Sequence, residues 1–322
     1  MRDKENMSVL RAAVIGVGYL GRFHAQKYYG HPDVELVGVV DSDVERAAEV
    51  AAECQTKAFA TMEEVLGNTD LVSIVVPTQH HYDVARQCLE AGCHILLEKP
   101  VTQTVEEAEK LIALARERGL VFQVGHLERF NPAVIALQGV LKNPEFIETH
   151  RLSPFKPRGT DVNVVLDLMI HDIDILLSMV QHELKTINSV GVPVLSNEVD
   201  IANARLQFAN GCVANVTASR VTREPMRKMR IFQQDAYISI DFQERKIAIY
   251  KKTPGVTLIP GLPDIGFKEM SFEQGDPLRD EIHAFVDSVR SGAPPVVSGE
   301  DGKHALEVAM QISQKLWHEV TD

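Results

Sequence analysis

Two groups of residues in the sequence could handle a proton. Lys99 lies between Glu98 and Pro100, directly after an apolar run, and Asp167 precedes His171 by four residues. An imidazole accepts a proton near neutral pH, and a carboxylate one helical turn away can orient the ring and hold its tautomer. A lysine can polarise the oxygen from which that proton leaves. A purely structural Asp167–His171 hydrogen bond within a core is the alternative that the helix alone leaves open.

A third group of residues forms a glycine-rich turn, Gly16-Val17-Gly18-Tyr19-Leu20-Gly21. The turn follows a predicted strand and opens a predicted helix, which is the context in which such a turn binds the pyrophosphate of a dinucleotide. Gly16 permits the tight turn, Gly18 the close approach of the backbone to the pyrophosphate, and Gly21 close packing of the helix on the strand. A glycine turn without a ligand is the alternative.

An acidic residue follows the next predicted strand and bears on the choice of cofactor. Asp41 comes 20 residues after Gly21, where a carboxylate accepts hydrogen bonds from the ribose hydroxyls and repels a 2′-phosphate. Ser42 follows it, and no arginine appears until Arg46, so we expect NAD rather than NADP. Capping of the following helix is the alternative role for Asp41, although Ser42 and Asp43 could serve there too. The three groups together predict a nicotinamide-dependent oxidoreductase.

The first third of the chain alternates between short apolar strands and helices. Sequences with capping-box spacing, Thr61 to Glu64 and Thr104 to Glu107, predict two of the helix starts. Strands are predicted at 9–15, 34–40, 71–76, 93–97 and 121–124, and helices at 19–29, 43–53, 80–91 and 105–118. This alternation predicts a doubly wound parallel sheet. Lys99 then lies at the carboxyl edge of that sheet, where ligands bind in open α/β folds.

The remainder of the chain has a different pattern. An apolar helix is predicted at 164–180, where Asp167, His171, Asp174 and Ser178 would form one polar stripe. Strands dominate from about 185 to 250, with hairpin signals at Asn210-Gly211 and at Gln234-Asp235, which predict an antiparallel sheet. Helices are predicted at 132–141, 278–290 and 301–318, and a loop at 254–266. We therefore expect a first domain over 1–126 and a second over 127–322, whose last helix could pack back on the first domain.

Composition narrows the class of protein. A chain of 322 residues with 45% hydrophobic residues can form two domains with real cores. A formal charge of −12 argues against nonspecific binding to nucleic acid or to an anionic membrane, although local cations could still bind an anionic substrate. No apolar run approaches the roughly 20 residues that span a bilayer. The start of the chain, 1–8, has no secretory pattern, so we expect a cytoplasmic protein.

Cysteine and histidine spacing predicts no metal site. The four cysteines form no CxxC pair, so we expect reduced thiols packed as small hydrophobic groups: Cys54, Cys88, Cys93 and Cys212. His171, Asp172 and Asp174 could be considered as ligands. However, Asp172 would point about 100° away from His171 on a helix, and no Cys or second His lies at ligand spacing.

With these residues described, the chain resembles the Gfo/Idh/MocA family of oxidoreductases. The likeness covers nearly the whole length and rests on four segments: GVGYLGRFH at 16–24, VVPTQHHYDVA at 75–85, EKP at 98–100 and DLMIH at 167–171. The resemblance implies a Rossmann domain followed by an α/β domain with a mostly antiparallel sheet, which commonly forms a dimer or tetramer interface. It also implies that Lys99 is the active-site lysine, His171 the acid/base, and Asp167 the residue that orients it.

The resemblance extends to binding residues, with some departures from the family pattern. The residues expected to bind the cofactor are Gly16, Gly18, Tyr19, Leu20, Gly21, Asp41, Ser42, Pro77, Thr78, His81, Glu98 and Lys99, and those expected near the substrate are His126, Arg158 and Asn163. Thr78 replaces an asparagine that is frequent in the family, and Leu168-Met169-Ile170 occupies the middle of its D-x-G-x-H pattern. These changes weaken the case for free monosaccharides or simple polyols as substrates.

Further segments are similar to one branch of the family, the UDP-N-acetylglucosamine 3-dehydrogenases and related uronic-acid enzymes. They include VGHLERFNPAV at 124–134 and LDLMIHDIDILL at 166–177. The branch implies NAD-dependent oxidation of a sugar hydroxyl, at carbon 3 of UDP-N-acetylglucosamine or a close UDP-sugar. A dehydrogenase of a free sugar, inositol or other cyclic polyol is the alternative, and a non-catalytic dinucleotide-binding regulator is another.

Cations in the second domain could bind the diphosphate of such a substrate. Arginine suits a diphosphate because its planar fork matches phosphate oxygens. The candidates are Arg151, Lys156, Arg158 and Arg220, each of which could equally be an ordinary surface cation.

Overall fold

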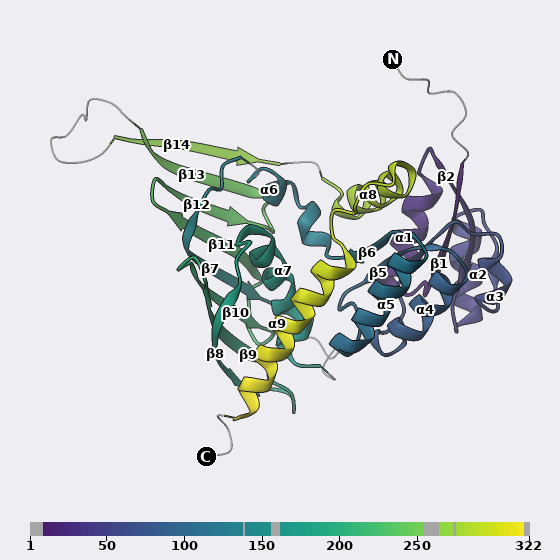
Figure 1. The fold of residues 1–322 in the computed structure, drawn as a ribbon, viewed down its shortest axis with the longest axis horizontal. Coiled ribbons are helices and arrows are strands. Elements are labelled where there is room, and N and C mark those ends of the chain that lie inside the picture. The colour runs from purple at the N-terminus through teal and green to yellow at the C-terminus, as the bar shows by residue number, and fades with distance from the viewer. Residues whose placement is uncertain (1–8, 138, 156–161, 254–263, 273–274, 319–322) are drawn as a thin grey trace. The chain divides into compact units, whose positions relative to one another are not determined.

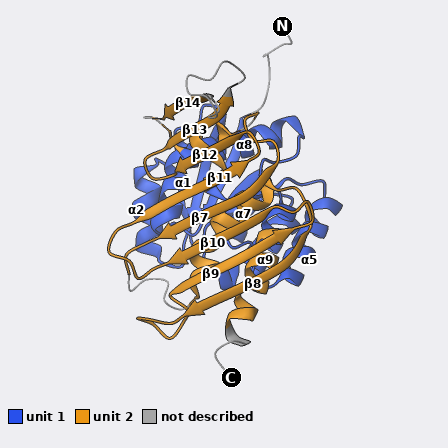
Figure 2. Cartoon of the chain, turned by 90° about the vertical axis from the view of Figure 1, so that its left-hand side faces the viewer, with its two compact units in different colours: residues 1–127, 277–303 blue, residues 128–276, 304–322 orange. Residues whose placement is uncertain are grey.

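The fold is taken from a computed structural model, which describes residues 9–137, 139–155, 162–253, 264–272 and 275–318 (Figure 1). The chain divides into two compact units (Figure 2). Unit 1 comprises residues 1–127 and 277–303, and unit 2 comprises residues 128–276 and 304–322. Residues 277–303, which the sequence analysis assigned to the second domain, thus belong to unit 1.

Unit 1 is built on a six-stranded parallel sheet, which confirms the predicted doubly wound fold. The strand order is β3-β2-β1-β4-β5-β6, so the order reverses between β1 and β4, which is where ligands bind in such sheets. The strands are β1 (Leu10–Ile15), β2 (Val34–Val40), β3 (Ala58–Phe59), β4 (Leu71–Ile74), β5 (His94–Glu98) and β6 (Phe122–Gly125). Their sequences are nearly continuous apolar runs because helices cover both faces of a parallel sheet.

The helices of unit 1 follow the predicted alternation. They are α1 (Tyr19–Tyr29), α2 (Val44–Glu53), α3 (Glu63–Leu66), α4 (His81–Glu90), α5 (Val105–Glu117) and α8 (Pro277–Ser291), with a 3-10 turn η1 (Thr78–His80). The capping box at Thr104 and Glu107 is present with both of its hydrogen bonds. The one predicted at Thr61 and Glu64 was wrong, because α3 begins after Met62 without a side-chain cap, and Glu64 instead accepts the N–H of Ala60.

Helix α8 belongs to unit 1 because its apolar face completes the core beside α1. Leu278, Ile282, Phe285 and Val286 lie on one face of the helix and pack in the same cluster as Tyr28. Helix α8 is far from α1 in the sequence, but the two helices pack against each other. This explains why a boundary drawn from sequence order placed the segment in the wrong unit.

Unit 2 contains an eight-stranded sheet with the order β14-β13-β12-β11-β7-β10-β9-β8. All neighbours are antiparallel except β7 and β10, so the expected mostly antiparallel sheet is confirmed. The strands are β7 (Pro144–Leu152), β8 (Leu184–Val192), β9 (Ile201–Phe208), β10 (Val213–Ser219), β11 (Met226–Gln233), β12 (Ala236–Asp241), β13 (Lys246–Thr253) and β14 (Asp264–Ser271). The predicted hairpin joins β9 to β10, with Gly211 at a φ of 87°.

Two predictions for unit 2 were incomplete. The helix expected at 132–141 is only α6 (Pro132–Ile135), preceded by a 3-10 turn, η2 (Leu127–Phe130). Strand β7, in the middle of the sheet, was not predicted. Its inward positions are Ile147, Thr149 and Arg151, so the apolar alternation that marks a half-buried strand is hidden.

The helices that the structure describes in unit 2 lie on one face of its sheet. The helices α7 (Ile170–Met179) and α9 (Gly299–His318), with the turn η3 (Val165–Met169) before α7, pack against the inner face through apolar residues such as Ile173 and Ile312. Figure 2 shows the other face, over which none of the described helices of unit 2 passes. Unit 2 therefore presents one whole side of its sheet outward.

A buried cation holds the inner face of unit 2 together. Arg151 is 3% exposed and its guanidinium lies 2.8 Å from Asp172 and 2.9 Å from Glu128. Burial alone would lower the pKa of Arg151, but the attraction of Asp172 and Glu128 outweighs it and raises the pKa. Because Asp172 is buried beside this cation, removal of Arg151 leaves buried negative charge without compensation.

We expect Arg151→Ala to lower the free energy of unfolding by about 3–5 kcal/mol, because the buried Asp172 carboxylate loses its cationic partner. Urea unfolding followed by circular dichroism measures the change. Arg227→Ala is the matched control, since Arg227 is half exposed and lies 3.8 Å from the same Glu128. An exposed pair contributes roughly 0–1 kcal/mol. Equal effects of the two substitutions would contradict the assignment.

Candidate active site

The glycine turn of unit 1 contains two glycines that the protein itself requires. Gly16 has a φ of 84°, and a Cβ there would lie 2.7 Å from the backbone of Val75. A Cβ on Gly21 would collide with the carbonyl oxygen of Gly16. Gly18 differs from both, because a Cβ there would meet only the guanidinium of Arg46, at 3.8 Å. The protein leaves room for a side chain at Gly18, so the absence of one there suits a ligand that approaches the backbone.

The start of helix α1 suits the phosphates of that ligand. Gly18 is the N-cap, no side chain caps the helix, and its first turn contains no acidic residue. The first N–H groups of a helix lack partners within the helix and attract an anion. Tyr19 and Leu20 open this helix, so the turn and the helix start form one candidate pyrophosphate site.

Asp41 ties the glycine turn to the end of β2. Its carboxylate accepts hydrogen bonds from the N–H of Val17 at 2.8 Å and of Asp43 at 2.9 Å, and Ser42 lies 3.5 Å away. The guanidinium of Arg46 is 3.6 Å from the same carboxylate. The two short hydrogen bonds use one acceptor site on each oxygen, so a ribose hydroxyl would replace the longer contact with Ser42 or Arg46. The residues of this half of the site thus fit a dinucleotide.

His81 joins the segments that follow β4 and β5. Its ring nitrogens lie 2.8 Å from the carbonyl oxygen of Pro100 and 2.9 Å from that of Val76. Burial lowers the pKa of His81, although the two carbonyls oppose this effect. His81 thereby fixes the chain around Pro77 and Thr78 against the segment that carries Lys99. His81 is 1% exposed, so we expect it to hold the segments of the cofactor site in place and not to contact the cofactor directly.

Glu98 and Lys99 lie where β5 ends. The Glu98 carboxylate accepts the N–H of Lys99 at 3.2 Å and lies 3.3 Å from Nε2 of His24. The Lys99–Pro100 peptide bond is cis. The Lys99 side chain is partly exposed, whereas His126, at the end of β6, is 1% exposed. Lys99 belongs to the carboxyl edge of the sheet, as predicted, and His126 follows the neighbouring strand β6.

Asp167 and His171 belong to unit 2, where Asp167 lies within a π-helical turn and His171 lies in the first turn of α7. The N–H of Ile170 bonds to the carbonyl oxygen of Val165, five residues back, before α7 begins. Such turns occur frequently at functional sites. Asp167 and His171 are both partly exposed, while the apolar residues between them include buried Met169 and Ile170. The structure therefore places Asp167 and His171, both partly exposed, on a largely apolar element of unit 2.

Two residues of the polar stripe predicted on this helix, Asp174 and Ser178, have structural partners. Asp174 is 1% exposed and pairs with Arg129 at 2.8 Å, and Ser178 donates to the carbonyl oxygen of Ile175. His171, Asp174 and Ser178 all lie on α7, after the π-helical turn, so the turn changes only their angular position relative to Asp167. Asp174 and Ser178 have structural roles.

Asn163 has a helix-capping role. Its side-chain oxygen accepts the N–H groups of Val165 and Leu166 at 3.1 and 3.2 Å, and its amide lies 3.3 Å from Ser313. It therefore sets the start of the turn that carries Asp167. A direct contact of Asn163 with substrate stays a prediction.

Two of the cations proposed for a diphosphate have other partners. Arg151 is the buried cation described above, and Arg220 is 5% exposed and lies 2.8 Å from Asp200. Burial alone would raise the pKa of Asp200, but hydrogen bonds from Arg220, Leu195 and Ser196 hold it well below its usual range. The prediction was wrong for Arg151 and Arg220, because both neutralise buried carboxylates. Lys156 and Arg158 lie outside the described residues.

The described residues contain no group of three or more His, Cys, Asp or Glu side chains that could hold a metal ion. Among the same residues, no helix is both long and apolar enough to cross a membrane.

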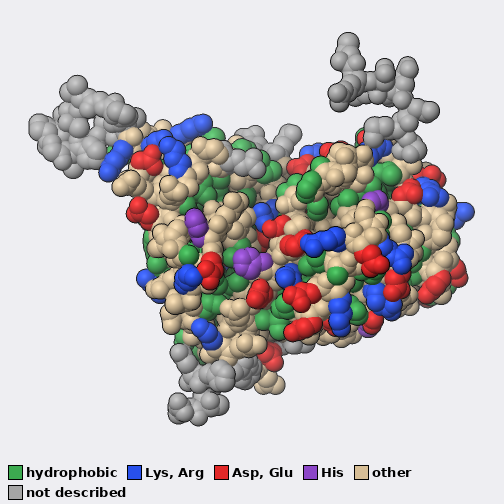
Figure 3. Space-filling model, viewed as in Figure 1, with side chains coloured by type: hydrophobic (Ala, Val, Ile, Leu, Met, Phe, Trp, Pro, Cys, Tyr) green, Lys and Arg blue, Asp and Glu red, His purple; other side chains and the backbone are tan. Residues whose placement is uncertain are grey.

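On the face shown in Figure 3, acidic and basic side chains of the described part are interspersed. This face thus has no broad field of one sign.

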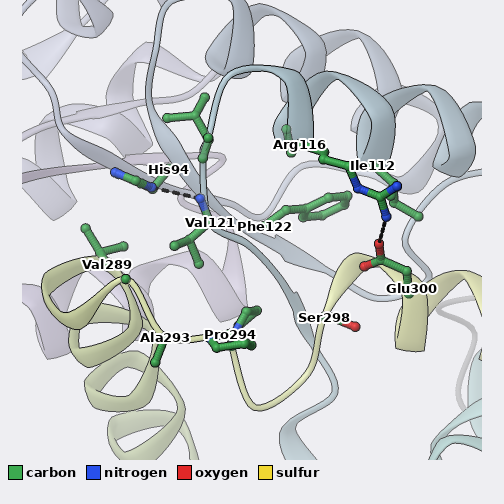
Figure 4. Close-up of a pocket in the computed structure, with 15 residues that line it drawn as sticks. His94, Ile112, Arg116, Val121, Phe122, Val289, Ala293, Pro294, Ser298 and Glu300 are labelled. Carbon is green, nitrogen blue, oxygen red and sulfur yellow. Dashed lines mark hydrogen bonds and ion pairs between the residues drawn. The ribbon is translucent and has the colours of Figure 1, made fainter.

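A pocket of unit 1 lies at the opposite edge of the sheet (Figure 4). It is lined by His94 and Phe122, at the amino ends of β5 and β6, and by residues around α5 and α8. His94 accepts the N–H of Val121 at 2.9 Å, and Arg116 pairs with Glu300 at 3.0 Å. Because β5 runs about 16 Å between this edge and Lys99, the pocket is separate from the candidate site.

Sequence reasoning overlooked a set of buried polar residues beneath Lys99. His24, Tyr28 and Ser73 are each 0% exposed and are linked to one another and to Glu98. A signal existed in the sequence, because Ser73 interrupts an apolar strand. His24 and Tyr28 also lie one turn apart on the face of α1 that contains Gly21.

The comparisons with known proteins agree with this geometry. Residues 10–126 match the sequence model of the oxidoreductase family with an NAD-binding Rossmann fold, and residues 139–239 match the GFO/IDH/MocA C-terminal domain. The site and fold thus define an NAD-dependent oxidoreductase. The chain belongs to the Gfo/Idh/MocA family.

Individual relatives refine this placement. UDP-N-acetylglucosamine 3-dehydrogenase of Acidithiobacillus ferrooxidans is 43% identical over 94% of this chain and 96% of its own. A solved structure of that enzyme, GnnA, has a TM-score of 0.89, with 96% of this chain and 98% of that chain covered at 41% identity. The NAD-dependent scyllo-inositol 2-dehydrogenase of Bacillus subtilis is 28% identical over 94% of this chain and 92% of its own. Levoglucosan dehydrogenase with NADH and L-sorbose, at 19% identity and a TM-score of 0.86 over 97% of this chain and 98% of its own, shares the fold.

The two kinds of glycine in the turn predict different defects. Gly18→Ala should leave the melting temperature near that of the wild type but weaken NAD binding about tenfold or more, because its methyl group enters the space of the ligand. Gly21→Ala should lower the melting temperature itself, because its Cβ collides with backbone. Thermal unfolding and calorimetric titration with NAD measure both. Wild-type affinity in Gly18→Ala would show that the cofactor does not approach this turn.

Proposed function

We propose that the protein uses NAD to oxidise a sugar hydroxyl to a ketone, at carbon 3 of UDP-N-acetylglucosamine or of a close UDP-sugar. The similarity to the Acidithiobacillus enzyme over nearly the whole of both chains carries the proposal. The presence of Lys99, Asp167 and His171 supports it from the residues. We place the activity in the cytoplasm, where NAD and nucleotide sugars are made.

The reaction needs a base, an electrophile and a hydride acceptor. NAD, when bound, supplies the acceptor. His171 removes the proton of the hydroxyl group, and Asp167 orients the imidazole and stabilises the imidazolium that forms. The ammonium of Lys99 polarises the hydroxyl oxygen as its negative charge develops. The proton therefore passes from the hydroxyl oxygen to His171 while the carbon loses a hydride.

The turn at Gly16–Gly21 and Asp41 would hold the cofactor. The helix start binds the pyrophosphate, and the Asp41 carboxylate accepts the ribose hydroxyls and disfavours a 2′-phosphate. Arg46 lies 3.6 Å from Asp41, but its guanidinium also lies 2.7 Å from Asp43. Two carboxylates thus share this cation, which supports NAD over NADP.

Dehydrogenation of an inositol or another cyclic polyol is the second candidate, because inositol dehydrogenases are among the relatives. Turnover of UDP-sugars compared with that of free polyols separates the two substrates. A non-catalytic dinucleotide-binding regulator would be expected to lack the lysine or the histidine. The presence of both residues supports an enzyme.

We expect His171→Ala and Lys99→Ala each to lower kcat by about 100- to 10,000-fold, because each removes a group that acts on the moving proton. NAD affinity should survive, most clearly in His171→Ala. Absorbance of NADH with UDP-N-acetylglucosamine as substrate measures turnover, and a coupled enzyme that consumes the ketone removes an unfavourable equilibrium.

Exposed residues of the same types are the controls for this experiment. His182 is exposed in unit 2 and Lys57 in unit 1, so His182→Ala and Lys57→Ala should retain wild-type turnover. Near-native turnover in His171→Ala or Lys99→Ala would refute the catalytic assignment. Turnover of inositols but not of UDP-sugars, lost in His171→Ala, would keep the chemistry and change the substrate.

We also propose that the chain forms a homodimer or homotetramer through the outer face of the sheet in unit 2. Aromatic rings follow one another across five strands of this face, with centroids 4.9 to 5.7 Å apart: Phe146, Phe232, Tyr237, Tyr250 and Phe267. At the other end of the sheet, Val190 and Val192 are half exposed. A contiguous exposed apolar surface marks an interaction site, and a second copy of the same face is a self-complementary partner.

Phe232→Glu combined with Tyr250→Glu should convert the oligomer to monomer, because association would then bury like charges on both copies. Sedimentation velocity over a range of concentrations measures the mass. Val44→Glu is the control, since Val44 is 67% exposed but lies on α2 of unit 1. A wild-type protein that stays monomeric, or a double variant that stays oligomeric, would contradict this interface.

A further inference from the structure

A buried chain of polar groups runs through unit 1 to the residue before Lys99. The phenol of Tyr28 lies 2.8 Å from Oγ of Ser73, and Nδ1 of His24 lies 3.1 Å from the same oxygen. Nε2 of His24 lies 3.3 Å from Oε1 of Glu98. Tyr28, Ser73 and His24 are 0% exposed. Burial of four polar groups is costly unless they satisfy one another, so their arrangement requires an explanation.

The donors and acceptors of this chain can be assigned in one direction. Burial raises the pKa of Tyr28, so the phenol keeps its proton and donates it to Ser73. Ser73 then donates to Nδ1 of His24, which leaves the ring proton on Nε2, toward the Glu98 carboxylate. In the opposite direction, Nδ1 of His24 would donate to Ser73, and Ser73 would donate to Tyr28. The lone pair of Nε2 would then face the Glu98 carboxylate, and the buried phenol proton of Tyr28 would have no acceptor. The first direction is therefore favoured.

Glu98 is enclosed on its other sides as well. Its second oxygen, Oε2, accepts the N–H of Lys99 at 3.2 Å. On the neighbouring strand, a Cβ at Gly125 would lie 2.9 Å from Oε1 and 3.2 Å from Cα of Glu98. Nε2 of His24 makes no hydrogen bond of good geometry among the described residues, although it lies 3.3 Å from Oε1 of Glu98. Its contact with Glu98 is thus electrostatic, and it still selects one orientation of the carboxylate.

We propose that His24 is a positioning residue for Lys99, acting through Glu98. Tyr28 and Ser73 hold neutral His24 in the tautomer with its proton on Nε2. The Lys99 N–H donates to one oxygen of the Glu98 carboxylate, and Nε2 of His24 lies 3.3 Å from the other. The backbone that aims the Lys99 side chain is thereby fixed from the core of the unit. The inference rests on the proposed catalytic role of Lys99.

The tautomer of His24 is testable in the wild-type protein without turnover. Long-range ¹H–¹⁵N spectra of histidine-labelled protein at pH 7 should show a neutral ring protonated on Nε2. The signal is assigned by its disappearance in His24→Gln. An Nδ1-protonated ring or an imidazolium would overturn the proposal, because neither agrees with the assigned chain.

The effect on catalysis is measured with His24→Leu and His24→Gln. His24→Leu should lower kcat by up to about 100-fold, because a small misplacement of a reacting group has an effect of this size. His24→Gln should recover much of the loss, since its amide can place a donor near the position of Nε2. His31→Leu is the matched control, because His31 is a buried histidine of unit 1, 6% exposed, that does not belong to the polar chain from Tyr28 to Glu98. His31→Leu should lose about as much stability as His24→Leu but should keep the wild-type kcat.

A double variant tests whether His24 acts through Lys99. If it does, His24→Leu with Lys99→Ala is no slower than Lys99→Ala alone. Additive losses, or wild-type kcat in a folded His24→Leu protein, would refute the inference. If His24→Leu does not fold, Tyr28→Phe removes only the terminal donor, and the same double-variant comparison is made with it. Near-native turnover in Lys99→Ala would refute the proposed function instead, and the tautomer measurement would still stand by itself.

Discussion

Parallel strands end at a single edge of their sheet, and the candidate cofactor site of unit 1 depends on this constraint. Gly16, Asp41, Pro77, Lys99 and His126 are spread over more than a third of the chain. Each follows the carboxyl end of a strand, so the sheet gathers them without any direct attraction between them. The local hydrogen bonds then set fine positions: Asp41 holds Val17, and His81 spans Val76 and Pro100.

Buried polar groups have different functions in the two units. In unit 2, Arg151, Arg129 and Arg220 neutralise buried carboxylates and hold secondary-structure elements together. Buried ion pairs of this kind contribute little net stability, but the loss of one partner is severe. In the arrangement proposed for unit 1, Tyr28, Ser73 and His24 carry no charge, and the chain ends at the Glu98 carboxylate. A neutral chain avoids the large desolvation penalty of a buried cation, and it still fixes the orientation of one carboxylate.

The sequence predicted unit 1 well because its signals are local. The glycine turn, the capping box at Thr104 and the apolar strands each depend on neighbouring residues, and the structure has all of them. Unit 2 was harder because its central strand, β7, carries Arg151 and Thr149 on the buried face. The burial of Arg151 and Thr149 depends on partners that are distant in sequence. The hydrophobic periodicity of the strand itself does not show these partners. Similarly, the sequence does not show that Asp174 pairs with Arg129, 45 residues away, so Asp174 was grouped with His171.

The same distinction applies to the candidate site. Motif positions such as Gly18, Lys99 and His171 are chosen by residue type and spacing, so the sequence could nominate them. The free cations expected for a diphosphate could not be nominated reliably, because only the fold shows that Arg151 and Arg220 already have carboxylate partners. His24 is the converse case, since its significance comes from Ser73 and Glu98, 49 and 74 residues away. A buried polar side chain becomes informative only when its partners are known.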